Sequence, residues 1–211
     1  MFISKKRNFI YLRTPKTGST SMSNYLIDQL GEDSDSIHTL INLLYIPSKN
    51  LRAGLQGFNP HSKIEQIINA GIVDKTFVEQ TNIYACLREP IDRFISRAYH
   101  IKNFDRNRTV QGLNKNKLVE KCLTMHDPNF HMWWPQTTWC TLNGKPVNKL
   151  FLHEDFNKAA SEMTGIDTSV NHRHRSNCRE DDTTPLDAGL ILEIQKMYAE
   201  DVALYKLIKG L

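Results

Sequence analysis

The segment from Asn8 to Leu30 constrains the fold of this chain most, because it predicts a strand, a tight loop and a helix in that order. Residues 9–12 (FIYL) form a continuous apolar run, which is typical of a parallel strand buried on both faces. Thr14-Pro15 ends the strand, since the residue before a proline is held extended. Apolar residues then recur at helical spacing over residues 22–30, and Gly31 is placed to end the helix.

The loop between this strand and helix has the composition of an anion-binding site. It carries one lysine, one glycine and four hydroxyl groups, from Lys16, Thr17, Gly18, Ser19, Thr20 and Ser21. Backbone N–H groups at a helix start, together with the helix dipole, favour a phosphate or sulfate there. The alternative is that the hydroxyls are ordinary N-caps. The ATPase motif GxxxxGK followed by Ser or Thr is absent.

A second strand is predicted at residues 82–87 (NIYACL), and Arg88 follows it directly. Ligands of open α/β sheets bind at the carboxyl ends of the strands. Pro90 suits the first position of a helix, whose apolar stripe runs over residues 91–98. Ser96 falls off that stripe, so we expect it to face a ligand. The alternative is that Arg88 pairs with a carboxylate and Ser96 is merely solvated.

The two motifs, PKTGSTS at residues 15–21 and Arg88-x-Pro90 with Ser96 in the following helix, resemble a known family. In this order they are similar to the nucleotide loops of sulfotransferases that use 3′-phosphoadenosine 5′-phosphosulfate (PAPS). The likeness is greatest to carbohydrate O-sulfotransferases of the heparan 2-O-sulfotransferase type. It covers most of the chain, weakly between the motifs. The resemblance implies a single sulfotransferase domain over residues 1–211, with an α/β, three-layer, P-loop-like fold and a central parallel sheet flanked by helices.

The resemblance also implies roles for individual residues. The loop at Lys16 to Ser21 would bind the 5′-phosphosulfate, with Lys16 as a catalytic residue beside the leaving phosphate. Arg88 and Ser96 would hold the 3′-phosphate. A basic loop late in the chain would close over the nucleotide, and its matching residues here are Arg175, Ser176 and Arg179.

His61 is the candidate for the general base that the resemblance implies between the two nucleotide motifs. It is the only histidine between residues 42 and 88, and a helical apolar pattern begins just after it. An imidazole suits this role because it titrates near neutral pH. A lone histidine can also be structural, in which case Glu154 or Asp155, after a third predicted strand at 149–153, would serve as the base.

The implied reaction transfers a sulfuryl group from PAPS to an acceptor hydroxyl, on a saccharide or another small alcohol. Like phosphoryl transfer, it is an in-line displacement in which fixed cations stabilise the spreading charge. We expect PAPS as cosubstrate and no metal ion. Two alternatives remain open: a P-loop nucleotide kinase, which would need ATP and magnesium, and a nucleotide-binding protein without catalysis.

Composition narrows the possible partners and the location. The net charge of +4 fits an anionic ligand but does not by itself indicate nucleic acid. Basic residues over 102–121 favour a solvated face, with binding of an anionic saccharide as the alternative. Four cysteines far apart indicate neither a zinc site nor a disulfide framework. No signal peptide or membrane-spanning run opens the chain, so we expect a cytoplasmic or otherwise soluble protein without a membrane anchor.

Three further elements are predicted. Residues 37–46 are apolar enough for a strand, with a helix as the alternative, and the strand at 149–153 precedes a helix over 156–163. A long closing helix is expected over residues 185–207, with apolar residues along one face. The tryptophans at 133, 134 and 139 either pack in the core or stack on a ligand, and Gln136 is the polar residue beside them.

Overall fold

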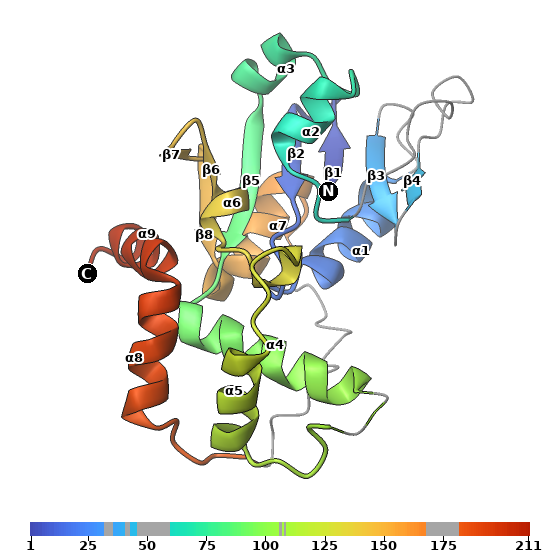
Figure 1. Ribbon diagram of the computed structural model, residues 1–211. Coiled ribbons are helices and arrows are strands. Elements are labelled where there is room, and N and C mark those ends of the chain that lie inside the picture. The colour runs from blue at the N-terminus through green and yellow to red at the C-terminus, as the bar shows by residue number, and fades with distance from the viewer. Residues whose placement is uncertain (32–35, 41–42, 46–59, 106, 108, 168–181) are drawn as a thin grey trace. The chain divides into compact units, whose positions relative to one another are not determined.

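The computed structural model of the chain describes residues 1–31, 36–40, 43–45, 60–105, 107, 109–167 and 182–211 (Figure 1). These residues belong to two compact units. The first comprises Met1–Leu87 and Gln136–His172, and the second comprises Arg88–Pro135 and Arg173–Leu211. The first unit contains the sheet, whereas the regular structure described in the second is helical.

A six-stranded mixed sheet forms the centre of the first unit, in the order β4-β3-β1-β2-β5-β8. Strands β2, β5 and β8 pair in parallel, and β1, β3 and β4 join them through antiparallel pairs. The strands span Phe2–Ser4 (β1), Phe9–Leu12 (β2), Ser36–Leu40 (β3), Leu43–Tyr45 (β4), Asn82–Leu87 (β5) and Lys149–Leu152 (β8). A separate two-stranded sheet pairs β6 (Thr141–Leu142) with β7 (Lys145–Pro146).

The sheet confirms some of the predicted strands and corrects others. The strands predicted at 9–12, 82–87 and 149–153 are the three parallel ones. The expected parallel sheet is therefore present at β2, β5 and β8, but the whole sheet is mixed, because β1 turns back onto β2 over residues 5–8. The strand expected over 37–46 is instead the antiparallel pair β3 and β4.

The parallel register brings three chain segments to one edge of the sheet. Leu12 pairs with Ala85, and Leu87 pairs with Leu152, so β2, β5 and β8 have their carboxyl ends at the same edge. Arg13, Arg88 and His153 directly follow these strands. This is the edge at which open α/β sheets bind ligands.

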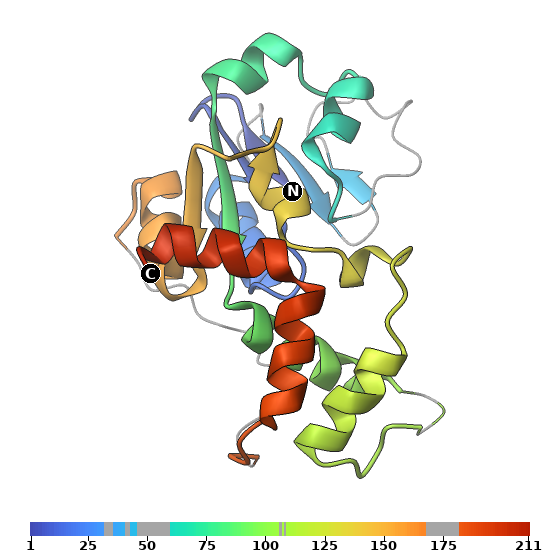
Figure 2. The same ribbon diagram turned by 60° about the vertical axis from the view of Figure 1, so that its left-hand side comes forward.

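Helices cover the sheet of the first unit on both faces (Figures 1 and 2). Helix α1 (Ser19–Leu30) and helix α7 (Phe156–Thr164) lie on one face, where Met22, Leu26 and Leu30 join the core as their spacing predicts. Helices α2 (Ile64–Asn69) and α6 (Thr137–Cys140) lie on the other face, and α3 (Lys75–Gln80) leads into β5. Gly31 caps the end of α1, as expected.

Four longer helices build the second unit: α4 (Pro90–Phe104), α5 (Lys115–Thr124), α8 (Ala188–Met197) and α9 (Ala199–Lys209). Pro90 is the first residue of α4, as predicted. The single closing helix expected over 185–207 is wrong, because the chain leaves the helical conformation at Tyr198. The ring of Tyr198 is buried, and its hydroxyl donates to the Trp133 carbonyl oxygen at 2.9 Å.

None of the helices that the structure describes is both long and apolar enough to cross a membrane.

Candidate active site

The loop between β2 and α1 is a tight turn built on two left-handed residues. Lys16 has φ of 66° and Gly18 has φ of 75°. Such an angle is uncommon for a residue with a side chain, so the surrounding structure must hold Lys16 in place. The Thr17 hydroxyl, fully buried, donates to the Thr14 carbonyl oxygen at 2.9 Å and closes the turn from within.

The start of α1 argues against the N-cap interpretation of the loop hydroxyls. Gly18 is the N-cap residue, and no side chain makes a capping hydrogen bond there. Ser19 and Ser21 are buried, and Thr20 is exposed. A helix start without a capping side chain presents its first N–H groups to an anion. The geometry of the loop therefore suits a phosphate or sulfate.

Arg13 places a second cation beside this loop, a role that the sequence analysis missed. Its side chain is largely buried, with 6% of the residue exposed. One guanidinium nitrogen, NH2, donates to Thr20 Oγ1 at 3.1 Å. Burial lowers the pKa of Arg13. The available signal was an arginine placed directly between a buried strand and an anion loop.

His61 is hydrogen-bonded to the main chain of Arg13. Its Nδ1 lies 2.6 Å from the main-chain carbonyl oxygen of Arg13. A carbonyl oxygen can only accept, so Nδ1 carries the proton of the neutral ring and Nε2 keeps its lone pair. The main chain is held too, because Trp139 Nε1 donates to the His61 carbonyl oxygen at 2.8 Å. His61 lies two residues before Lys63, the N-cap of α2, which agrees with its expected place at a helix start.

The third segment at the sheet edge contributes an imidazole. A Cβ atom added to Gly18 would lie 3.3 Å from Phe156 Cε2 and 3.5 Å from His153 Nε2. His153 is partly buried next to the loop, whereas Glu154 and Asp155 are exposed. From the sequence, His153 was predicted only as the end of a strand.

Arg88 and Ser96, in the second unit, have different surroundings. Arg88 Nε donates to Asp92 Oδ2 at 2.6 Å, so the carboxylate pairing considered above is present. Ser96 is buried, with 4% exposed, although its position lies off the apolar stripe of α4. Whether this pair holds a phosphate stays a prediction. Arg175, Ser176 and Arg179 lie outside the described residues.

Of the three tryptophans, which could pack in the core or stack on a ligand, two are buried and one is partly exposed. Trp133 and Trp139 are buried, and Trp139 positions His61. Trp134 is partly exposed, and its indole N–H donates to the Pro128 carbonyl oxygen at 2.8 Å. Gln136 is buried, and its carbonyl oxygen accepts from the main chain at the end of α6.

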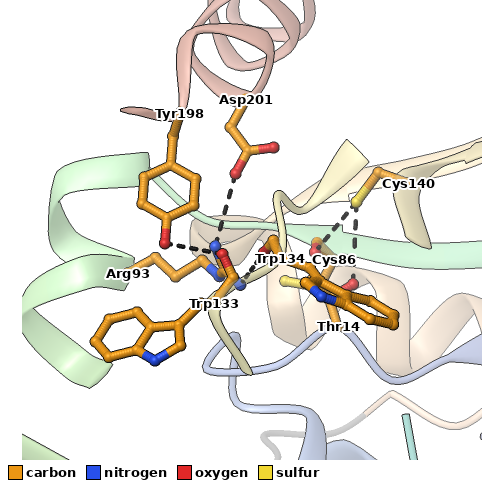
Figure 3. A network of polar contacts seen from close by, with 8 residues as sticks. All are labelled: Thr14, Cys86, Arg93, Trp133, Trp134, Cys140, Tyr198 and Asp201. Atoms are coloured by element: carbon orange, nitrogen blue, oxygen red, sulfur yellow. Dashed lines mark hydrogen bonds and ion pairs between the residues drawn. The ribbon is translucent and has the colours of Figure 1, made fainter. Parts of the chain in front are cut away.

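The buried thiol of Cys140 lies beside Thr14, just before the loop. Cys140 Sγ donates to the Cys86 carbonyl oxygen at 3.7 Å and lies 3.9 Å from Thr14 Oγ1 (Figure 3). Over the part of the chain that the structure describes, no three His, Cys, Asp or Glu residues gather as metal ligands would.

The candidate site combines a sheet edge, an anion-binding loop with cations beside it, and an imidazole whose tautomer is fixed. Such a site suits the transfer of an anionic group. The model of the sulfotransferase family matches residues 1–207. The chain therefore belongs to the sulfotransferase family. No curated protein and no solved structure matches it. The match supports a sulfotransferase and leaves the nucleotide kinase alternative without support.

Replacing Gly18 by alanine tests the close packing of the loop. We expect Gly18→Ala to lower the free energy of unfolding by about 1–2 kcal/mol, because a Cβ is strained at this φ, and to weaken anion binding as Phe156 and His153 shift. Gly71→Ala is the matched control, since Gly71 has φ of 66° and open space around it. Urea denaturation and titration with 3′,5′-bisphosphoadenosine measure the two effects. Loss of stability without any loss of affinity, as in the control, would contradict the packing argument.

Proposed function

We propose that this sulfotransferase moves a sulfuryl group from PAPS to an acceptor hydroxyl on a saccharide or another small alcohol. The observation that carries the proposal is Arg13, whose carbonyl oxygen holds His61 while its guanidinium contacts Thr20 of the anion loop. A candidate base and a candidate donor site are thereby joined through one residue. The family to which the chain belongs supports the reaction class.

We further propose that the fold is of the three-layer, P-loop-like type and that residues 1–211 act as one domain. Helices on both faces of β2, β5 and β8 support the first statement. The family match, which runs through both compact units, supports the second.

On the donor side, the loop stabilises the departing nucleotide. The acceptor oxygen forms a bond to sulfur while the bond from sulfur to the 5′-phosphate oxygen breaks, which leaves negative charge on that phosphate. Lys16 and the first N–H groups of α1 would neutralise this charge. Thr17 serves the loop by closing its turn, and Ser19, Thr20 and Ser21 would contribute hydroxyls or backbone donors.

On the acceptor side, His61 would accept the proton of the attacking hydroxyl at Nε2. The ring is oriented by its Nδ1–H bond to the Arg13 carbonyl oxygen, which also stabilises the imidazolium that forms. Glu154 and Asp155 are the competing bases, and their exposure gives them less of the fixed orientation that proton transfer needs.

The remaining nucleotide contacts rest on the resemblance in sequence. We propose that Arg88 and Ser96 hold the 3′-phosphate, with Asp92 fixing the plane of the guanidinium through Nε. Arg175, Ser176 and Arg179 would complete the nucleotide site. No step of the proposed mechanism uses a metal ion.

The central test is turnover of labelled PAPS with a panel of saccharides, alcohols and tyrosine peptides, followed by mass spectrometry. We expect Lys16→Ala to lower the turnover number by about a hundredfold or more, because a transition-state donor is lost. The melting curve should be unchanged, since no core side chain is removed. Lys5→Ala, an exposed lysine in the same unit, is the control and should retain full turnover. Wild-type turnover of Lys16→Ala would exclude the leaving-group role.

Nucleotide selectivity tests Arg88. Wild-type protein should bind 3′,5′-bisphosphoadenosine far more tightly than AMP, because only the bisphosphate has a 3′-phosphate. Arg88→Ala should reduce this preference by about ten- to a hundredfold, the usual worth of a charged hydrogen bond. Calorimetry gives both affinities, with Lys121→Ala on the exposed side of α5 as control. Equal affinity of the wild-type protein for the two nucleotides would remove the proposed 3′-phosphate site.

Parallel variants identify the base. His61→Ala should lower the turnover number by about 10²–10⁴-fold, the typical contribution of a general base, with little change in nucleotide affinity. Wild-type turnover should fall at acid pH, because a protonated imidazole has no lone pair for the acceptor proton. Glu154→Gln should keep its activity. An active His61→Ala enzyme with an unshifted acid limb would transfer the role to the carboxylates.

A further inference from the structure

Helix α4 carries two buried arginines one turn apart, Arg93 and Arg97, and Arg93 contacts Tyr198 and Asp201 at the start of α9. Among the buried charged side chains described in the second unit, Asp201 supplies the one carboxylate. Arg93 Nη1 lies 3.7 Å from Asp201 Oδ2, and Arg93 Nη2 donates to the Trp134 carbonyl oxygen at 2.8 Å (Figure 3). The carboxylate is therefore engaged by Arg93, and the buried charged side chains described in this unit are two cations and one anion.

Arg97 makes no ion pair or hydrogen bond with any residue that the structure describes. Its guanidinium carbon lies over two rings instead, 5.0 Å from the centroid of Trp133 and 5.3 Å from that of Phe130. The residue is 9% exposed, and its Nε is buried without an acceptor. Burial, and then the charge of Arg93, lowers the pKa of Arg97 to about 10, which leaves it cationic at neutral pH. Burying such a charge is unfavourable, and ring contacts offset only part of the cost.

The surface around Arg97 is aromatic. Phe130, whose ring covers the guanidinium, is 42% exposed. His131 and Trp134 are partly exposed beside it, with ring centroids 5.0 Å (Phe130 to His131) and 6.4 Å (His131 to Trp134) apart. Burial, and then Arg97, lowers the pKa of His131, so this ring is neutral at neutral pH. Within the described residues, the cluster thus combines one cation that has no ion-pair partner with several flat apolar faces.

We propose that Arg97, together with Phe130, His131 and Trp134, forms a binding site for an acidic saccharide. A sulfate or carboxylate of the sugar would pair with the Arg97 guanidinium, which can present two N–H groups to such a group. The apolar face of the sugar ring would lie on an aromatic ring. Anion binding at Arg97 stands on the geometry of the second unit, whereas a saccharide as the ligand rests on the proposed function.

The first experiment measures binding of inorganic sulfate and of a heparin-derived tetrasaccharide by calorimetry, at constant ionic strength and with 3′,5′-bisphosphoadenosine at saturation. Arg97→Met is compared with Lys196→Met, which removes the same charge from an exposed position on α8. We expect Arg97→Met to weaken both ligands by about ten- to a hundredfold and Lys196→Met to leave them unchanged. Equal losses in the two variants, or no saturable binding by the wild-type protein, would overturn the site. Sulfate binding at Arg97 with no gain in affinity for the tetrasaccharide would overturn the saccharide assignment.

A second measurement needs no apolar variant and decides the matter if Arg97→Met does not fold. In wild-type protein labelled with ¹⁵N-arginine, the Nε–H resonance of Arg97 is the one that Arg97→Lys removes. We expect this resonance to shift on addition of the tetrasaccharide and to stay in place with neutral maltohexaose. An unchanged resonance would refute the proposal. PAPS turnover is assayed separately, so that absent turnover with an intact Arg97 titration would count against the proposed function alone.

Discussion

The hydrogen bond from His61 Nδ1 to the main-chain carbonyl oxygen of Arg13 is the contact on which the candidate site depends. It joins residues 48 positions apart, and it forms only because Arg13 is held at the end of a fully buried strand. The guanidinium of the same residue turns toward Thr20 at the start of α1. A displacement of Arg13 would therefore move both the anion loop and the imidazole. Two hydrogen bonds of Arg13 thus hold the site together, one accepted by its main-chain carbonyl oxygen and one donated by its guanidinium.

The packing of the loop extends this constraint to the far end of the sheet. Phe156 and His153 approach Gly18 so closely that a Cβ would just contact them. Phe156 begins α7, whose buried residues pack with α1 in one core cluster. The left-handed angle at Gly18 and the missing side chain there serve the same end, since the first turns the chain and the second lets α7 close against it. Contacts around the loop must offset the backbone strain at Lys16, whose φ is 66°.

Local patterns in the sequence identify the elements that depend on neighbouring residues. The apolar run of β2, the helical spacing of α1 and Pro90 at the start of α4 are all of this kind, and the structure confirms them. No glycine or proline in the sequence marks the break between α8 and α9 at Tyr198. The break accompanies a tertiary contact with Trp133, which a local pattern does not show. The contribution of Arg13 was not foreseen for the same reason: its partners lie on other segments. The burial of Ser96 also depends on tertiary packing, which a helical stripe alone does not report.

The choice of a carbonyl oxygen as the partner of His61 has an electrostatic consequence. In many sites a carboxylate orients the imidazole and strengthens it as a base. A carboxylate here would stand beside a loop proposed to bind a polyanionic donor, and the two negative charges would repel each other in a partly buried setting. The carbonyl oxygen of Arg13 fixes the tautomer without adding a charge, while the guanidinium of that residue adds a positive one at the loop. The candidate site thereby avoids a negative charge beside His61 and gains a positive charge at the loop. In the proposed reaction the leaving group is a phosphate that gains charge, and this arrangement would stabilise its departure.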